Sequence, residues 1–347
     1  MKTIPLGQSG IMVPEFCLGS MTFGTQTSEA DAHTQIDMSI AAGVNFVDVA
    51  EMYPVNPISA ETQGRSEEII GSWIAKNRRE DLIVATKHSG AGLKHIRDGA
   101  PITAASVPEV IAGSLKRLQT DVIDLYQLHW PNRGSYMFRQ NWTYDPSGQN
   151  KADTLANMAE VLEALQREVE KGTIRAFGLS NESAWGTSQW LRIADEVGGP
   201  RVASIQNEYS LLCRMFDTDL AELSVNEDVA LLAFSPLATG LLTGKYQNGA
   251  VPEGSRKSVG SANLGGRVSE RVFDAVDAYL QIAQKHGLDP VHMAMAFTVQ
   301  RPFGCSSIFG ATTVAQLDHI LAGRDLRLSD EVLGEINDAH RAHPMPY

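Results

Sequence analysis

Four polar residues of complementary chemistry lie at or just beyond the ends of apolar stretches in the first part of the chain. Asp48 interrupts the apolar run "NFVDV", and Tyr53 follows it five residues later. Lys87 ends the run "LIVATK", and His129 ends the run "VIDLYQLH". Asp48, Lys87 and His129 recur at intervals of about one strand–helix unit, so consecutive units of a barrel would bring all four to one rim.

These residue types together describe proton transfer to a carbonyl oxygen. A lysine at the end of an apolar strand loses hydration, so it sheds its proton or keeps a carboxylate nearby, and Asp48 is available. A nearby cation favours the phenolate, so we expect Lys87 to lower the pKa of Tyr53 and make it a general acid–base. His129 could hydrogen-bond a substrate oxygen or share in the proton transfer. Reduction of a carbonyl would also require a hydride donor.

The elements that must position these residues are short apolar strands that alternate with amphipathic helices. The expected strands cover 16–18, 44–49, 82–87, 122–129, 174–180, 203–209, 229–236 and 306–311. Strands that are apolar on both faces, with helices between them, are typical of a parallel sheet. Eight such units predict an α/β protein with a closed (β/α)8 TIM barrel, preceded by an N-terminal β-hairpin. We expect one domain over 1–347, and a capping box of Ser106 and Glu109 at one helix start.

Two long loops, 130–154 and 239–266, follow the fourth and seventh strands, at the C-terminal face where barrel active sites lie. Aromatic residues crowd the first of these loops: Trp130, Tyr136, Phe138, Trp142 and Tyr144. Their number indicates an aromatic substrate pocket that includes Trp130, Tyr53 and His129. Packing of the loop on itself would give the same composition.

Composition and charge exclude several classes of protein. The 347 residues carry a net charge of -12, which argues against a nucleic-acid binder and against anionic membrane surfaces. An anionic cofactor would therefore need a local cluster of cations. The three cysteines are far apart and form no CxxC pair, which favours reduced thiols over zinc or disulfides. No membrane span, secretion signal, Walker A motif or GxGxxG motif is recognisable, and we expect a cytoplasmic protein.

Several longer motifs occur in a characteristic order: "GVNFVDVAEMY", "VATK", "DLYQLHWP", "IRAFGLSNES", "IQNEYSLL", "AFSPLATGLLTGKY" and "GATTVAQL". With these motifs the chain resembles the aldo-keto reductase superfamily over nearly its whole length, and most of all its Tas-like bacterial branch, which is similar to potassium-channel β-subunits. The resemblance implies a barrel that binds NADP(H) in extended form without a Rossmann motif. It also implies that Tyr53 donates the proton, Lys87 lowers its pKa, Asp48 holds Lys87, and His129 orients the carbonyl.

The same resemblance implies the residues that hold the cofactor. Ser180, Asn181 and Gln206 match the side chains that bind the nicotinamide carboxamide, and Phe234 matches the aromatic that stacks on its ring. The loop that meets the pyrophosphate is matched by Ser235, Pro236, Leu237, Gly240 and Lys245. Without the resemblance, the three carboxamide side chains would be ordinary polar residues at strand ends, and Phe234 would be a core residue.

The adenosine end of the predicted cofactor site departs from the family. Thr312 and Gln316 match it. Many members then carry a Glu and an Asn that grip the adenine, where this chain has His319 and Ile320. No arginine in "GATTVAQLDH" is placed for a 2′-phosphate, so NADP(H) is expected from the family while NAD(H) is possible. Elsewhere, Arg256 and Lys257 in "GSRKS" add a basic spot to the acidic chain, and a solvated pair of loop residues is the alternative reading.

The sequence therefore predicts an NADP(H)-dependent oxidoreductase that reduces small aldehydes or ketones, as a monomer or homo-oligomer. The alternative is a cofactor-binding, redox-sensing regulatory subunit that resembles channel β-subunits, assembles as a ring and binds a membrane partner. A metal-dependent barrel hydrolase ranks far behind, because His88 and His129 are too few ligands and no HxH or HExxH motif occurs. We expect no metal.

Overall fold

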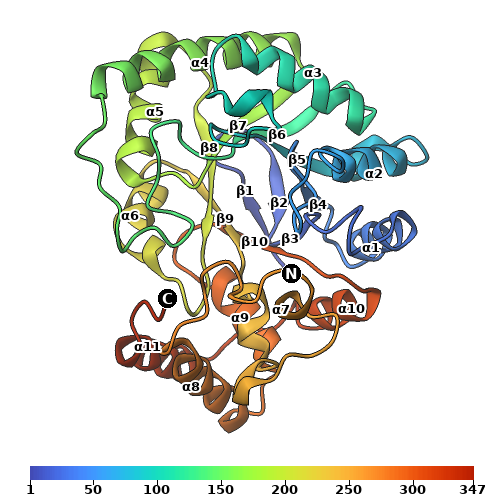
Figure 1. Ribbon diagram of the computed structural model, residues 1–347, viewed down its shortest axis with the longest axis vertical. Helices are drawn as coiled ribbons and strands as arrows, with labels where there is room; N and C mark the ends of the chain where they lie inside the picture. The colour runs from blue at the N-terminus through green and yellow to red at the C-terminus, as the bar shows by residue number, and fades with distance from the viewer.

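Eight parallel strands close into a barrel in the computed structural model, which describes residues 1–347 (Figure 1). The barrel strands are β3 (Phe16–Gly19), β4 (Phe46–Asp48), β5 (Ile83–His88), β6 (Ile123–Leu128), β7 (Ile174–Ser180), β8 (Val202–Glu208), β9 (Ala230–Phe234) and β10 (Cys305–Phe309). Each strand pairs with the next along the chain, and β10 closes the ring against β3. The predicted (β/α)8 barrel and all eight strands are confirmed.

An antiparallel hairpin of β1 (Thr3–Pro5) and β2 (Met12–Pro14) precedes the barrel, as predicted. Its apolar side chains Leu6, Ile11 and Val13 pack with the lower interior of the barrel. That interior is filled by apolar side chains such as Phe46 and Leu125. The hairpin therefore closes the N-terminal end of the barrel and leaves the C-terminal end as its mouth.

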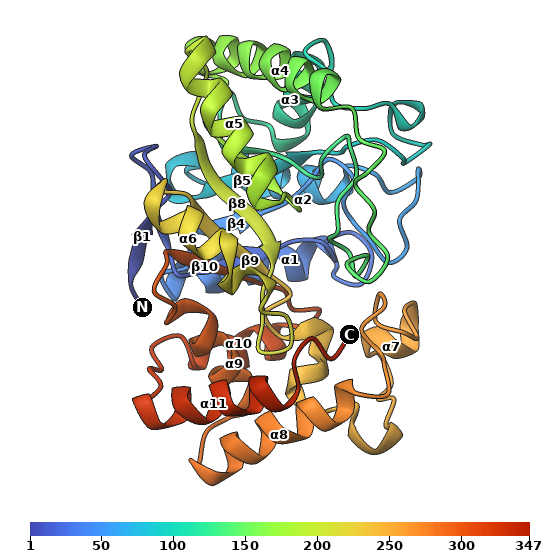
Figure 2. The same ribbon diagram turned by 90° about the vertical axis from the view of Figure 1, so that its left-hand side faces the viewer.

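Helices form an outer layer around the barrel (Figures 1 and 2). They are α1 (Glu29–Ala41), α2 (Arg65–Ile74), α3 (Ser106–Leu118), α4 (Lys151–Lys171), α5 (Ala184–Val197), α6 (Asp219–Asn226), α7 (Arg256–Val259), α8 (Val272–Lys285), α9 (Pro290–Val299), α10 (Val314–Ala322) and α11 (Asp330–Ala342). Figure 2 shows α8 and α11 packed side by side at one end of the molecule. None of these helices has the length and apolar character that crossing a bilayer requires.

Local sequence explains where several helices begin and end. Asn150 caps α4 with its side chain, and Gly172 ends the helix with a left-handed φ of 77°. The predicted capping box of Ser106 and Glu109 is wrong, because α3 already includes Ser106, and Ala105 at its N-cap makes no side-chain hydrogen bond. Thr103 and Ser106 instead exchange side-chain hydrogen bonds with each other's backbone N–H, because the Ser106 hydroxyl fills the role of the expected glutamate.

Candidate active site

The structure brings Asp48, Tyr53, Lys87 and His129, here called the tetrad, together at the mouth of the barrel. The Lys87 ammonium donates to Asp48 Oδ2 at 2.6 Å and to the Val49 carbonyl at 2.9 Å. Its Nζ also lies 3.3 Å from the Tyr53 hydroxyl and 4.6 Å from the centre of that ring. The rings of His129 and Tyr53 meet edge to face at 5.9 Å. Lys87 is fully buried, so its charge acts at close range on the phenol.

Burial sets the protonation states of the tetrad. Burial raises the pKa of Tyr53, and the opposing effect of the Lys87 ammonium does not overcome it. The prediction of a lowered pKa for Tyr53 is therefore wrong, because desolvation of the phenolate outweighs the nearby cation. Burial by itself would lower the pKa of Lys87, but Asp48 and Tyr53 together raise it. Burial, aided by Lys87, holds the pKa of His129 well below its usual value, so the imidazole is neutral.

Aromatic rings continue outward from the tetrad along the loop after β6. The Trp130 ring lies 4.8 Å from the His129 ring, and Phe138 lies 6.4 Å beyond Trp130. The Trp130 indole donates to the Ala91 carbonyl at 3.0 Å, which fixes its orientation. Trp130 therefore lies beside the tetrad, and its role in a substrate pocket stays a prediction.

The other aromatic residues of this loop have different environments. Tyr136 and Tyr144 pack against each other at 6.0 Å, and Trp142 is exposed with the Arg271 guanidinium 5.5 Å from its ring. Part of the aromatic content of the loop is therefore explained by the packing of rim segments on each other.

The three side chains expected to hold a carboxamide are buried and make hydrogen bonds within the chain. The Asn181 amide nitrogen donates to the His129 carbonyl at 2.9 Å and to Ser180 Oγ at 3.1 Å. Its Oδ1 is buried and has no partner. The Gln206 amide nitrogen donates to Asp48 Oδ1 at 2.8 Å and to Gln127 Oε1 at 3.1 Å. A buried acceptor without a donor is costly, and a nicotinamide carboxamide N–H fits it.

A second polar cluster lies in the segment after β9, and we call Lys245, Arg256 and Lys257 the basic loop. The ammonium groups of Lys245 and Lys257 lie 5.2 and 5.9 Å from the ring of Tyr246, whose buried hydroxyl has no partner. Burial and repulsion from neighbouring arginines lower the pKa of Arg256 to about 10. None of the three cations forms an ion pair, so the basic loop fits a phosphate group.

The backbone that leads into the basic loop is shaped by residues of the predicted pyrophosphate site. Phe234 is half-buried at the end of β9, and Pro236 behind it is buried. Gly240 donates to the Leu237 carbonyl at 2.9 Å and has a φ of 93°. A Cβ there would lie 2.8 Å from Lys245 Cε, so this glycine makes room for the lysine side chain.

The residues of the predicted adenosine end contact other parts of the chain. Thr312 donates through both its N–H and its hydroxyl to Gln316 Oε1, each at 3.0 Å. His319 bonds Asp289 Oδ2 at 2.9 Å, and Ile320 is buried in the core. Gln316 Oε1 and the His319 imidazole therefore already have partners within the chain.

A buried carboxylate joins three distant segments at the mouth. Glu208, the last residue of β8, accepts hydrogen bonds from Arg139 at 2.9 Å, Arg267 at 2.8 Å and the Tyr347 hydroxyl at 3.0 Å. Arg267 also donates to Ser235 Oγ at 3.3 Å. Sequence reasoning missed this group, because the partners of Glu208 come from two loops and the C-terminal segment.

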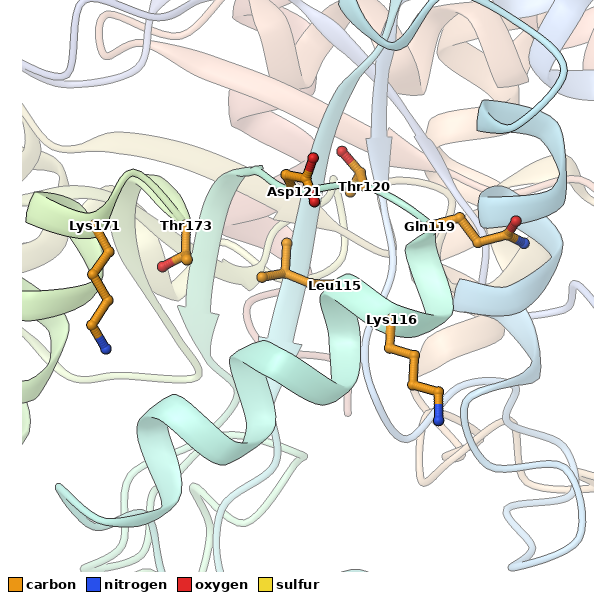
Figure 3. A pocket seen from close by; sticks show the side chains of 7 residues that line it. All are labelled: Leu115, Lys116, Gln119, Thr120, Asp121, Lys171 and Thr173. Atoms are coloured by element: carbon orange, nitrogen blue, oxygen red, sulfur yellow. The ribbon is translucent and has the colours of Figure 1, made fainter.

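A separate hollow lies away from these groups. Figure 3 shows its lining, which includes Lys116, Thr120 and Asp121 just before β6 and Lys171 and Thr173 just before β7. It is at the N-terminal ends of these strands, whereas His129 follows the C-terminal end of β6. The hollow is therefore not part of the tetrad site.

A closed parallel barrel with a buried lysine–aspartate pair against a tyrosine at its mouth defines a barrel oxidoreductase. The chain belongs to the aldo/keto reductase family, whose family model matches residues 15–341. It is 46% identical over 346 residues to Protein tas of Escherichia coli K12, with 97% of each chain covered. It is 29% identical over 362 residues to a probable voltage-gated potassium channel subunit beta of Arabidopsis thaliana, covering 98% of this chain and 96% of that one. It is 26% identical over 345 residues to the NADH-specific methylglyoxal reductase of Escherichia coli K12, with 95% of each covered.

Proposed function

We propose that this protein is an NADP(H)-dependent oxidoreductase that reduces aldehydes or ketones to alcohols, with Tyr53 as the proton donor. One observation carries the proposal: the Lys87 ammonium lies between Asp48 Oδ2 at 2.6 Å and the Tyr53 hydroxyl at 3.3 Å. A buried cation at this distance stabilises the negative charge that the phenol acquires as it gives up its proton.

The proton follows a short path through the tetrad. A bound nicotinamide supplies the hydride that adds to the carbonyl carbon. Tyr53, whose raised pKa keeps it protonated at neutral pH, gives its proton to the carbonyl oxygen. Lys87 then stabilises the phenolate, which recovers a proton from solvent. Asp48 keeps the lysine charged throughout.

His129 orients the substrate through a hydrogen bond and neither gives nor takes a proton. Its lowered pKa keeps the imidazole neutral, and its Nδ1 is buried without a partner. Nε2 is therefore the nitrogen that we assign as hydrogen-bond donor to the carbonyl oxygen. Trp130, 4.8 Å from this ring, would cover one side of the substrate.

The charge of the basic loop supports NADP(H) over NAD(H). A pyrophosphate carries two negative charges, whereas Lys245, Arg256 and Lys257 supply three positive charges with no carboxylate partner. The third cation would be available for a 2′-phosphate. Ser180, Asn181 and Gln206 would hold the carboxamide, and Thr312 and Gln316 the adenosine end.

The proposal is tested on the purified protein with both dinucleotides. NADPH fluorescence should be quenched or shifted on binding, and NADPH should be consumed with an aromatic aldehyde such as 4-nitrobenzaldehyde. NADH, titrated in parallel, should bind more weakly. A protein that alters the fluorescence of neither dinucleotide would contradict the proposal.

The regulatory role is a separate hypothesis that rests on relatives whose names include a potassium channel subunit beta. Size-exclusion chromatography with light scattering separates the two, since a ring of several chains is expected only for the regulatory subunit. A monomer that turns over aldehydes would support the enzymatic role and contradict the regulatory one.

A further inference from the structure

The top of the barrel interior is polar where such interiors are usually filled by branched apolar side chains. On β4, β5 and β6 the interior positions Phe46, Ala85 and Leu125 are apolar. Two residues further along each strand, the inward side chains are Asp48, Lys87 and Gln127. Lys87 and Gln127 are paired in register across the sheet, and both are fully buried.

Gln127 donates one hydrogen bond and accepts another within this layer. Its amide nitrogen donates to Asp48 Oδ1 at 3.2 Å, and its Oε1 accepts from the Gln206 amide nitrogen at 3.1 Å. Gln206 donates its other hydrogen to Asp48 Oδ1 at 2.8 Å. Asp48 thus receives Lys87 on one oxygen and the two glutamines on the other.

This arrangement fixes the orientation of the Gln206 amide. Both hydrogens of its nitrogen are occupied, by Asp48 and by Gln127, so only its oxygen can serve a ligand. If the acceptor on Gln127 were removed, Gln206 would lose the partner that holds its amide in this orientation. Asp48 would at the same time lose one of its donors.

We propose that Gln127 is a positioning residue that orients Gln206 toward the nicotinamide carboxamide and holds Asp48 toward Lys87. This inference rests on the proposed function, because it concerns how the chain prepares the same site. Gln127 contacts neither the reacting phenol nor any residue of the basic loop in the hydrogen bonds of the structure. It therefore acts through Gln206 and Asp48.

The test is a double-mutant cycle on NADPH affinity, measured by fluorescence titration of the full chain. Gln127→Leu and Gln206→Leu should each weaken binding by about 10-fold, the scale of one hydrogen bond to a ligand plus one unsatisfied group. Because both act through one contact, the double variant should also be weakened by only about 10- to 30-fold. A double variant weakened by about 100-fold, the product of the singles, would overturn the inference, as would Gln127→Leu with parental affinity.

A matched control is available in Gln35 of α1. It is also fully buried, but both polar atoms of its amide have no partner. Gln35→Leu makes the same chemical change outside the barrel interior and should leave NADPH affinity unchanged. If Gln35→Leu weakened binding as much as Gln127→Leu, loss of a buried amide in general would explain the result and the inference would fail.

A pH profile separates positioning from simple packing. Gln127→Glu retains both hydrogen bonds only while the new carboxyl group is protonated, and burial beside Asp48 favours that form. NADPH affinity of this variant should approach the parental value as the pH falls and weaken as it rises, relative to the parental profile. Affinity as low as that of Gln127→Leu at every pH would overturn the inference, because the protonated carboxyl group can make both hydrogen bonds. If the parental protein itself binds no NADPH, the proposed function fails instead, so the two failures are distinguishable.

Discussion

The tetrad and the basic loop are both charged, yet they are built in opposite ways. In the tetrad the Lys87 ammonium has a carboxylate at 2.6 Å, a carbonyl at 2.9 Å and the phenol at 3.3 Å. In the basic loop Arg256 and Lys257 have no ion-pair partner, and the hydroxyl of Tyr246 is buried without one. The tetrad is complete within the chain, whereas the basic loop needs an anion from outside to balance it.

This difference separates catalysis from binding. Groups that act on a transition state are most effective when the protein holds them in place beforehand. Unpaired cations are costly to hold close together, and a bound phosphate would relieve that cost. We therefore expect changes in the tetrad to lower turnover and changes in the basic loop to lower cofactor affinity.

The largest effect is expected from Lys87→Met. Removing the cation beside the phenol should lower turnover by about 10³-fold, and it should also destabilise the fold by about 3 kcal/mol, because Asp48 would remain as a buried unpaired charge. Adding Asp48→Asn should restore stability in thermal unfolding without restoring turnover. The control is Lys116→Met, which makes the same substitution at an exposed lysine. A Lys87→Met variant with parental turnover would show that the Lys87 ammonium is not required for the reaction.

A smaller effect, confined to binding, is expected from the double variant Arg256→Ala/Lys257→Ala. Loss of charge-assisted contacts should raise the Kd of NADPH by about 10- to 100-fold and that of NADH by less, while kcat at saturating cofactor changes only a few-fold. Parental affinity should also fall with added salt. Equal losses for the two dinucleotides would show that these cations do not select the 2′-phosphate.

The pH profile of reduction distinguishes a raised from a lowered pKa at Tyr53. Because burial raises that pKa and lowers that of His129, the proton donor stays protonated and the imidazole stays neutral across the neutral range. We expect kcat/KM for the aldehyde to be level from about pH 6 to 9 and to fall only above about pH 10. A decline that begins near pH 7 would mean that Lys87 outweighs burial.

The smallest effect is expected from Gly240→Ala. The φ of 93° and the 2.8 Å approach to Lys245 Cε should cost about 1 kcal/mol in thermal unfolding and a few-fold in NADPH affinity. Gly148→Ala is the matched control, because open space surrounds that position in the loop after β6. If the two variants lost the same amount of stability in thermal unfolding, the steric role assigned to Gly240 would be contradicted.

The sequence was sufficient for the barrel and for the position of the tetrad. Polar residues at the ends of successive apolar strands follow directly from strand order, so Asp48, Lys87 and His129 could be placed at one rim. The pKa of Tyr53 could not be predicted, because desolvation depends on tertiary packing that no local pattern records.

Polar contacts between segments that are distant in the chain could likewise not be predicted from the sequence. Glu208 meets Arg139, Arg267 and Tyr347 only because two loops and the C-terminal segment converge on β8. Gln127 was recognisable in hindsight as a polar residue two positions before His129 in an apolar strand. The capping box was misplaced, because Ser106 can serve either as the cap or as the partner of a cap such as Thr103.

The most direct test of the central claim is single-turnover reduction of an aldehyde by NADPH-loaded Tyr53→Phe. We expect a rate at least about 100-fold below that of the parental protein, the scale of a lost general acid, with the Kd of NADPH unchanged. The control is Tyr136→Phe in the loop after β6. It removes a phenol hydroxyl that makes no hydrogen bond, so this variant should keep the parental rate. A Tyr53→Phe variant that also keeps the parental rate would contradict the assignment of Tyr53 as proton donor.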